Sequence, residues 1–164
     1  MKATELLKEQ HDEVKAIFKQ LEHGNGHTEA LVHKLANSLA GHMVIEQELF
    51  YPAVMKVKED LVLEGYEEHA VARFALKRLL KSDKADHTFK AKVTTLKELI
   101  EHHVKEEEED LFPKAEKALT PEGSEALCKL MKKLFDQTVK EGFENAIGKG
   151  GAAVTSASAP ELSS

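Results

Sequence analysis

Apolar side chains recur at steps of three and four residues along most of the chain, which is the spacing of amphipathic helices. In the first helix, expected at about residues 4–22, this spacing is carried by Leu7, Val14, Phe18 and Leu21. The pattern predicts four further helices, at about residues 28–52 or slightly beyond, 61–80, 87–118 and 121–144. The chain of 164 residues is therefore predicted to be all-α.

Short polar segments separate these helices. Residues 23–27, HGNGH, interrupt the first helix with two glycines, and Thr28 is expected to cap the second helix at its N-terminus. Thr120 followed by Pro121 is expected to open the last helix as N-cap and first-turn proline. Short connections favour antiparallel neighbours, so we predict an up-down-up-down four-helix bundle over about residues 4–118, with an additional C-terminal helix.

The end of the chain differs in composition from the rest. From Gly148 it reads GKGGAAVTSASAPELSS, so we expect residues 147–164 to form a flexible tail after one helical domain of residues 1–146. The single cysteine, Cys128, falls in an apolar pattern, which predicts a buried, unreactive thiol. The inward positions expected in the same helix are Leu127, Leu130, Met131, Leu134 and Phe135.

Charge and hydropathy restrict the partners of the protein. The formal net charge of −6 disfavours nucleic acid and anionic membranes as general partners. The sequence has no apolar run of about eighteen residues that could cross a bilayer, and its N-terminus, MKATELLKEQHDEV, lacks the apolar region of a secretion signal. Together with the single cysteine, these features favour a cytoplasmic location.

Two segments repeat the same polar pattern. In both GHMVIEQELFYP and HHVKEEEEDLFP a histidine is followed by a glutamate four residues later and by a proline ten residues later. His42 therefore corresponds to His103, and Glu46 to Glu107. The prolines predict either a bend in each helix or a helix end.

The repeat extends to the preceding helix of each half. HDEVKAIFKQL, which begins at His11, resembles HAVARFALKRL, which begins at His69. Each half of the chain therefore contributes one single histidine and one histidine–glutamate pair, and all of them fall on apolar helix faces.

These six residues are the candidate metal ligands. A buried glutamate without a partner is costly, and a cation would offset that cost. Imidazole and carboxylate together suit iron, zinc or manganese. Six such groups are too many for one tetrahedral ion and suit two ions about 3.5–4 Å apart with bridging carboxylates. The candidates are His11, His42, Glu46, His69, His103 and Glu107.

The remaining histidines, and Glu106 and Glu109 of the EEEED run, are expected at the surface. A single core histidine usually finds a hydrogen-bond partner and binds no metal, so only the joint pattern of six residues indicates a site. The alternative is a metal-free interaction bundle that purifies without metal. The residues assigned to the surface are His23, His27, His33, His87, His102, Glu106 and Glu109.

With these motifs, and with the endings ELFYP and DLFP, the chain resembles the hemerythrin-like (HHE) cation-binding family over about residues 4–118. The resemblance implies a non-haem di-iron centre with an oxo or hydroxo bridge. It implies His11 and His42 on one iron, His69 and His103 on the other, and the two glutamates as bridges.

The oxygen carriers of this family have a further histidine near the third-helix ligand. Here the positions four before and four after His69 are Gly65 and Arg73. Neither residue replaces that histidine well, so the chain departs from the oxygen carriers. The resemblance then implies binding of, or reaction with, O2, peroxide or NO. The electron donor is unidentified, and enzymatic turnover is left open. The alternative is an iron- or oxygen-responsive regulatory module whose stability or partner binding depends on metal occupancy. Tyr66 is expected to be a packing residue, with a proton donor as the alternative.

Overall fold

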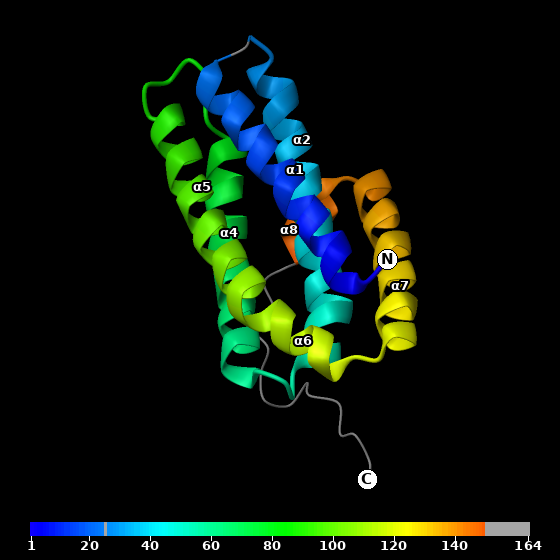
Figure 1. The fold of residues 1–164 in the computed structure, drawn as a ribbon. Helices are drawn as coiled ribbons and strands as arrows, with labels where there is room; N and C mark the ends of the chain where they lie inside the picture. Colours follow the sequence, from blue (N-terminus) through cyan, green and yellow to red (C-terminus); the bar gives the residue numbers. More distant parts are fainter. Residues whose placement is uncertain (25, 150–164) are drawn as a thin grey trace.

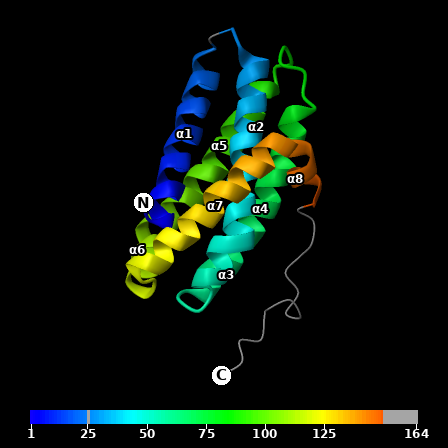
Figure 2. The same cartoon turned by 90° about the vertical axis from the view of Figure 1, so that its right-hand side faces the viewer.

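The computed structural model describes residues 1–24 and 26–149, and over these residues the protein is a helical bundle without strands (Figure 1). The helices α1 and α2 pack side by side, as do α4 and α5, and Figures 1 and 2 show these neighbours running antiparallel. The predicted four-helix bundle is confirmed. Its long helices are α1 (Ala3–His23), α2 (Thr28–Ile45), α4 (Glu59–Leu80) and α5 (Phe89–Glu106).

Two of the bundle helices contain a π-helical turn, in which an amide bonds the carbonyl five residues earlier. The amide of Tyr51 bonds the Glu46 carbonyl, and the amide of Phe112 bonds the Glu107 carbonyl. The chain continues as helix after each turn. The turns are η1 (Glu46–Phe50) and η2 (Glu107–Leu111), and the continuing helices are α3 (Tyr51–Val54) and α6 (Phe112–Ala118).

The two prolines follow these π turns directly. Because the helix continues past Pro52 and Pro113, their interpretation as helix ends is wrong. The expected bend is visible in Figure 1, where α6 departs from the axis of α5. Pro52 has no N–H, so the Gln47 carbonyl has no partner five residues ahead. The Tyr66 hydroxyl donates to that carbonyl at 3.0 Å.

The apolar core consists of two clusters along the bundle. One contains Phe18, Leu39 and Leu96, and the other contains Ile45 and Phe112. The helices α1, α2 and α4 contribute to both clusters, and α5 contributes to the first while its continuation in η2 and α6 contributes to the second, so an apolar stripe runs along each bundle helix and its continuation. The helix residues between the two clusters include the candidate ligands.

The C-terminal part of the described chain packs on the outside of the bundle. The helix α7 spans Pro121–Glu141 and lies against α1 and α2, and α8 spans Phe143–Lys149 and lies against α2 (Figure 2). As predicted, the Thr120 side chain caps α7, accepting from the Gly123 amide at 3.1 Å. The Cys128 side chain is buried, also as predicted. No helix in the described residues is long and apolar enough to cross a membrane.

Four local predictions are corrected. His27 occupies the N-cap position of α2, and Thr28 is already helical. The last predicted helix ends early, because Gly142 adopts φ +87°, a conformation that favours glycine. The residues after it form α8, with Ile147 in the core, so the tail does not begin at 147; residues 150–164 lie outside the described part. Leu130 is 55% exposed, because the buried face of α7 is centred on Cys128 and Met131.

A close contact between α2 and α7 depends on Gly41. A Cβ atom at this position would lie 2.7 Å from two ring carbons of Phe135. We expect Gly41→Ala to lower the free energy of unfolding by roughly 1–3 kcal/mol relative to Gly148→Ala, since overpacking costs about that much. Gly148 is the matched control because its Cβ would meet nothing within 4 Å. Urea unfolding of both variants measures the difference, and equal stabilities would contradict the close packing.

Candidate metal centre

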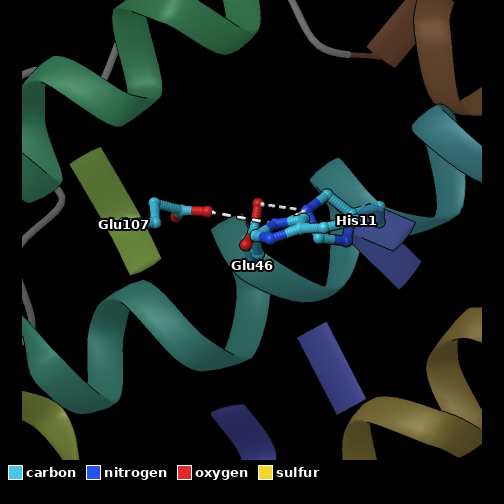
Figure 3. Close-up of side chains that lie close together, drawn as sticks. His11, Glu46 and Glu107 are labelled. Atoms are coloured by element: carbon cyan, nitrogen blue, oxygen red, sulfur yellow. Dashed lines mark hydrogen bonds and ion pairs between the residues drawn. The ribbon is translucent and has the colours of Figure 1, made fainter. Parts of the chain in front are cut away.

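The structure brings all six candidate residues together between the two apolar clusters. Each is at most 4% exposed. Figure 3 shows His11, Glu46 and Glu107 pointing toward one another. His11 comes from α1 and His69 from α4, while each histidine–glutamate pair lies where an α-helix meets its π turn. The repeat in the sequence is therefore a repeat in space.

The four histidines form two similar pairs. The Nε2 atoms of His11 and His42 are 3.1 Å apart, and those of His69 and His103 are also 3.1 Å apart. The rings meet edge to face in both pairs, with interplanar angles of 64° and 65°. Two nitrogens at this separation match neighbouring ligand positions on one ion that each reaches at about 2.0–2.1 Å.

Glu46 contacts both pairs. Its Oε2 atom is 3.2 Å from Nε2 of His42 and 3.2 Å from Nε2 of His69. Neither carboxylate oxygen of Glu46 accepts a hydrogen bond of good geometry from the described residues, although both are buried. Burial alone would raise the pKa of Glu46, but the charges of the neighbouring histidines, His42 first, hold it well below its usual range.

Glu107 is placed in the corresponding way. Its Oε2 atom lies 3.4 Å from Nε2 of His11 and 3.5 Å from Nε2 of His103, and within the described residues it accepts no hydrogen bond. Its other oxygen, Oε1, accepts a hydrogen bond from the Tyr51 hydroxyl at 2.9 Å. Both glutamates therefore join one histidine pair to the other.

This donor set fits metal cations. Two buried carboxylates with unpaired oxygens face four imidazole nitrogens, and ions would satisfy both kinds of group. Without metal, protons on the imidazoles balance the charge of the carboxylates. Burial lowers the pKa of His11 and His103, but the neighbouring carboxylates, Glu107 first, outweigh it and raise both, whereas burial lowers the pKa of His69 to about 4. Metal binding at neutral pH must therefore displace protons from the site.

The outer nitrogens of three histidines are held by polar side chains that the sequence analysis did not identify. A bond at Nδ1 fixes the ring and leaves Nε2 facing the centre. Gln10 and Glu68 occupy equivalent places in the repeat, each directly before a single histidine, which is the signal that could have identified them. The distances from Nδ1 to the side-chain oxygen are 2.7 Å for His11 and Glu108, 2.8 Å for His42 and Gln10, and 2.5 Å for His103 and Glu68.

Tyr51 is the other residue that the sequence analysis missed. It is fully buried, and its hydroxyl lies 3.3 Å from Nε2 of His69 and 3.4 Å from Nε2 of His103. Burial raises the pKa of Tyr51 well above its usual value, so the hydroxyl keeps its proton and donates to Glu107. Tyr66, the tyrosine considered from sequence, bonds the Gln47 carbonyl instead, as a structural residue.

The space for the Tyr51 hydroxyl is left by a glycine. A Cβ atom on Gly65 would lie 2.7 Å from the hydroxyl oxygen. Gly65 lies four residues before His69, on the same face of α4. The repeat counterpart of Tyr51 is Phe112, which stacks on His11 as Tyr51 stacks on His69 but has no hydroxyl. The two halves of the centre are therefore chemically unequal.

A small cavity of about 10 Å³ adjoins the four histidines. This is room for about one water molecule. Its remaining walls are the aliphatic and thioether side chains Val14, Leu39, Met43, Ile100 and Val104.

The residues assigned to the surface lie there with one exception. Glu106 is half-buried, and one of its oxygens is enclosed. The exposed residues are His23, His27, His33, His87, His102 and Glu109.

Known proteins similar to this chain contain a cation-binding domain. Residues 2–115 match the family model described as "Hemerythrin HHE cation binding domain". A crystal structure of a hemerythrin HHE cation binding domain-containing protein from Mycobacterium kansasii is similar, with a TM-score of 0.77 and 26% sequence identity. The similarity covers 93% of this chain and 96% of that one. No curated protein compared with the chain matches it significantly in sequence.

Metal binding should depend on the buried histidines and not on a surface histidine of the same helix. Saturating metal at about 100 times its dissociation constant should add about 2.7 kcal/mol to the free energy of unfolding. We expect His42→Ala to lose most of this gain, whereas the control His33→Ala, at an exposed position of α2, retains it. Chemical unfolding with and without metal measures the gain. An undiminished gain in His42→Ala would exclude this histidine as a ligand.

The Tyr51 hydroxyl should matter in a way that the Tyr66 hydroxyl does not. Tyr51→Phe removes the donor to Glu107 and leaves a buried oxygen unpaired, so we expect metal-free protein to lose roughly 1–3 kcal/mol of stability. The visible spectrum of the iron-loaded protein should also change. Tyr66→Phe is the control, since it should leave the spectrum as it is. Identical spectra for wild type and Tyr51→Phe would show that this hydroxyl does not act on the centre.

Proposed function

The chain belongs to the hemerythrin HHE cation-binding family, and on this basis we propose that it is a non-haem di-iron protein that binds or reacts with O2, peroxide or NO. In this proposal His11 and His42 hold one iron, and His69 and His103 hold the other. Glu46 and Glu107 are shared between the two ions. Zinc or manganese fits the same donors, so the metal present in the cell depends on availability as well as on the site.

The shared glutamates support two ions over one. Each histidine pair has its own Nε2–Nε2 contact of 3.1 Å, and each carboxylate lies against one histidine of each pair. The donors that lie within 4.8 Å of one another form two groups, one with His11 and His42 and the other with His69 and His103, and Glu46 belongs to both. Two ions bridged by carboxylates use every donor.

The bound iron pair would supply a change of redox state and a coordination position for a small oxidant. The protein keeps bulk water away, because the candidate ligands are at most 4% exposed. Gln10, Glu68 and Glu108 orient the imidazoles. The Tyr51 hydroxyl holds a proton beside Glu107, where it can stabilise negative charge that develops at the centre. We place this chemistry in the cytoplasm, with an unidentified electron donor.

The observation that favours small molecules is the cavity beside the four histidines. At about 10 Å³ it admits a ligand of two heavy atoms only with slight adjustment of its walls. Its aliphatic lining offers no hydrogen bonds to a larger polar substrate. The site therefore favours O2, NO or hydrogen peroxide over bulky oxidants.

The proposal predicts both the metal content and selection by size. Anaerobically purified protein should contain two irons per chain by elemental analysis, and its visible spectrum should change on exposure to O2, NO or hydrogen peroxide. In stopped-flow measurements tert-butyl hydroperoxide should react at least about tenfold more slowly than hydrogen peroxide, because packed side chains would have to move. Leu39→Ala, which opens the cavity wall, should narrow this difference.

Leu35→Ala is the matched control, since Leu35 is equally buried on α2 but does not line the cavity. Its selectivity should remain that of the wild type. Equal rates with both peroxides in wild-type protein would rule out reaction through this cavity. Stability that falls on chelation, without any reaction with the three molecules, would instead favour the regulatory module.

A further inference from the structure

The outer face of α4 carries an unusual group of apolar side chains. Of the large apolar residues that are well exposed in the described chain, three lie on this one helix: Leu63 at 42%, Val71 at 54% and Phe74 at 64%. The face is opposite to the one that carries His69, and α4 lies on the far side of the bundle from α7 (Figure 1). Clustered exposed apolar residues mark interaction surfaces.

Charged residues continue the same face in both directions. Glu64 and Glu67 precede the apolar pair Val71 and Phe74, and Arg78 and Lys81 follow it. All six side chains are exposed, and their steps of three, four, three, four and three residues form one seam of the coiled-coil type. We call these six residues the α4 seam.

The charges of the α4 seam have no ion-pair partner among the described residues. Elsewhere on the surface such pairs are common, for example Lys97 with Glu22 at 2.8 Å. The helix dipole favours basic residues in the last turn of a helix and acidic residues in the first turn. It therefore accounts for Arg78 but not for Glu67, which lies well beyond the first turn of α4. Arg78 lies over the Phe74 ring, 5.9 Å from its centroid.

The repeat shows that this seam is not required by the fold. On α1, the positions that correspond to Val71 and Phe74 are Glu13 and Ala16. The same bundle position is therefore compatible with an ordinary polar surface, and the seam belongs to α4 alone.

We propose that the α4 seam is the interface of a symmetric homodimer, in which two copies of α4 pack antiparallel. The order acidic, acidic, apolar, apolar, basic, basic is complementary to itself when reversed. With the twofold axis between Val71 and Phe74, each Val71 meets the partner's Phe74. Each Glu67 then faces the partner's Arg78, and each Glu64 faces the partner's Lys81.

Charge selects this arrangement over the alternatives. A parallel pairing of the same helices would place Glu67 against Glu67 and Lys81 against Lys81, which like-charge repulsion disfavours. One helix pair buries little area, so the dimer should form in a concentration-dependent equilibrium. The inference does not depend on the proposed function, because the ligand-bearing face of α4 is not involved.

The experiment uses the symmetry of the interface. Sedimentation equilibrium of the full chain over about a hundredfold range of concentration should show monomer and dimer for the wild type. Glu67→Lys alone and Arg78→Glu alone should each weaken dimerisation by about tenfold or more, since each creates two like-charge contacts. A 1:1 mixture of the two variants should form heterodimers, visible by native mass spectrometry. The double variant should dimerise as the wild type does.

Lys132→Glu, an exposed charge reversal on α7, is the control and should not change dimerisation. Phe74→Ala should abolish the dimer while circular dichroism and thermal unfolding of the monomer stay unchanged, because the ring is mostly exposed. A wild type that is monomeric at every concentration would overturn the proposal, and the α4 seam would then be a binding surface for a different partner. So would a dimer that is insensitive to both reversals, or single variants that do not associate with each other.

Discussion

The structure depends on one constraint, the burial of two carboxylates among four imidazoles in the middle of an apolar bundle. Charges in such a place need partners of opposite sign, and the protein provides them only in part. Oxygen atoms of Glu46 and Glu107 are enclosed without a hydrogen bond from the described residues. The two apolar clusters on either side hold the polar layer in place, so the same packing that stabilises the fold keeps the candidate cation site closed to water.

The internal repeat explains how a small chain builds this layer. Each half contributes a single histidine, a histidine–glutamate pair and a π turn, and the outer bonds from Gln10 and Glu68 repeat as well. Because the two halves are nearly symmetric, the few positions at which they differ indicate features that the fold does not require. Tyr51 brings a hydroxyl to one side of the centre and Phe112 brings none to the other. The α4 seam likewise has no counterpart on α1. Both the asymmetric centre and the proposed interface thus arise where the two halves differ.

The π turns connect the fold with the chemistry. One additional residue in a helical turn rotates everything after it by about 100° relative to a regular helix. This lets Glu46 and Tyr51, five residues apart, approach the same centre, although a regular helix would separate them by about 140°. The turn also frees the Gln47 carbonyl, which Tyr66 satisfies from the neighbouring helix. Single π turns inside α-helices are rare, and they are frequently found at functional sites.

The sequence by itself determined the helices, the bundle, the burial of Cys128, and the gathering of six ligand-type residues on inward faces. These follow from the helical period, which acts locally and repeats along the chain. The tertiary structure decided the roles of Tyr51 and Tyr66. The π turn η1 changes the direction of Tyr51, which follows it, and the Gln47 carbonyl within that turn accepts a hydrogen bond from Tyr66 on the neighbouring helix α4. It also decided the outer partners of the histidines, the exposure of Leu130 and the last helix, α8. These depend on contacts between helices distant in the sequence, and the spacing of residues within one helix carries no information about them.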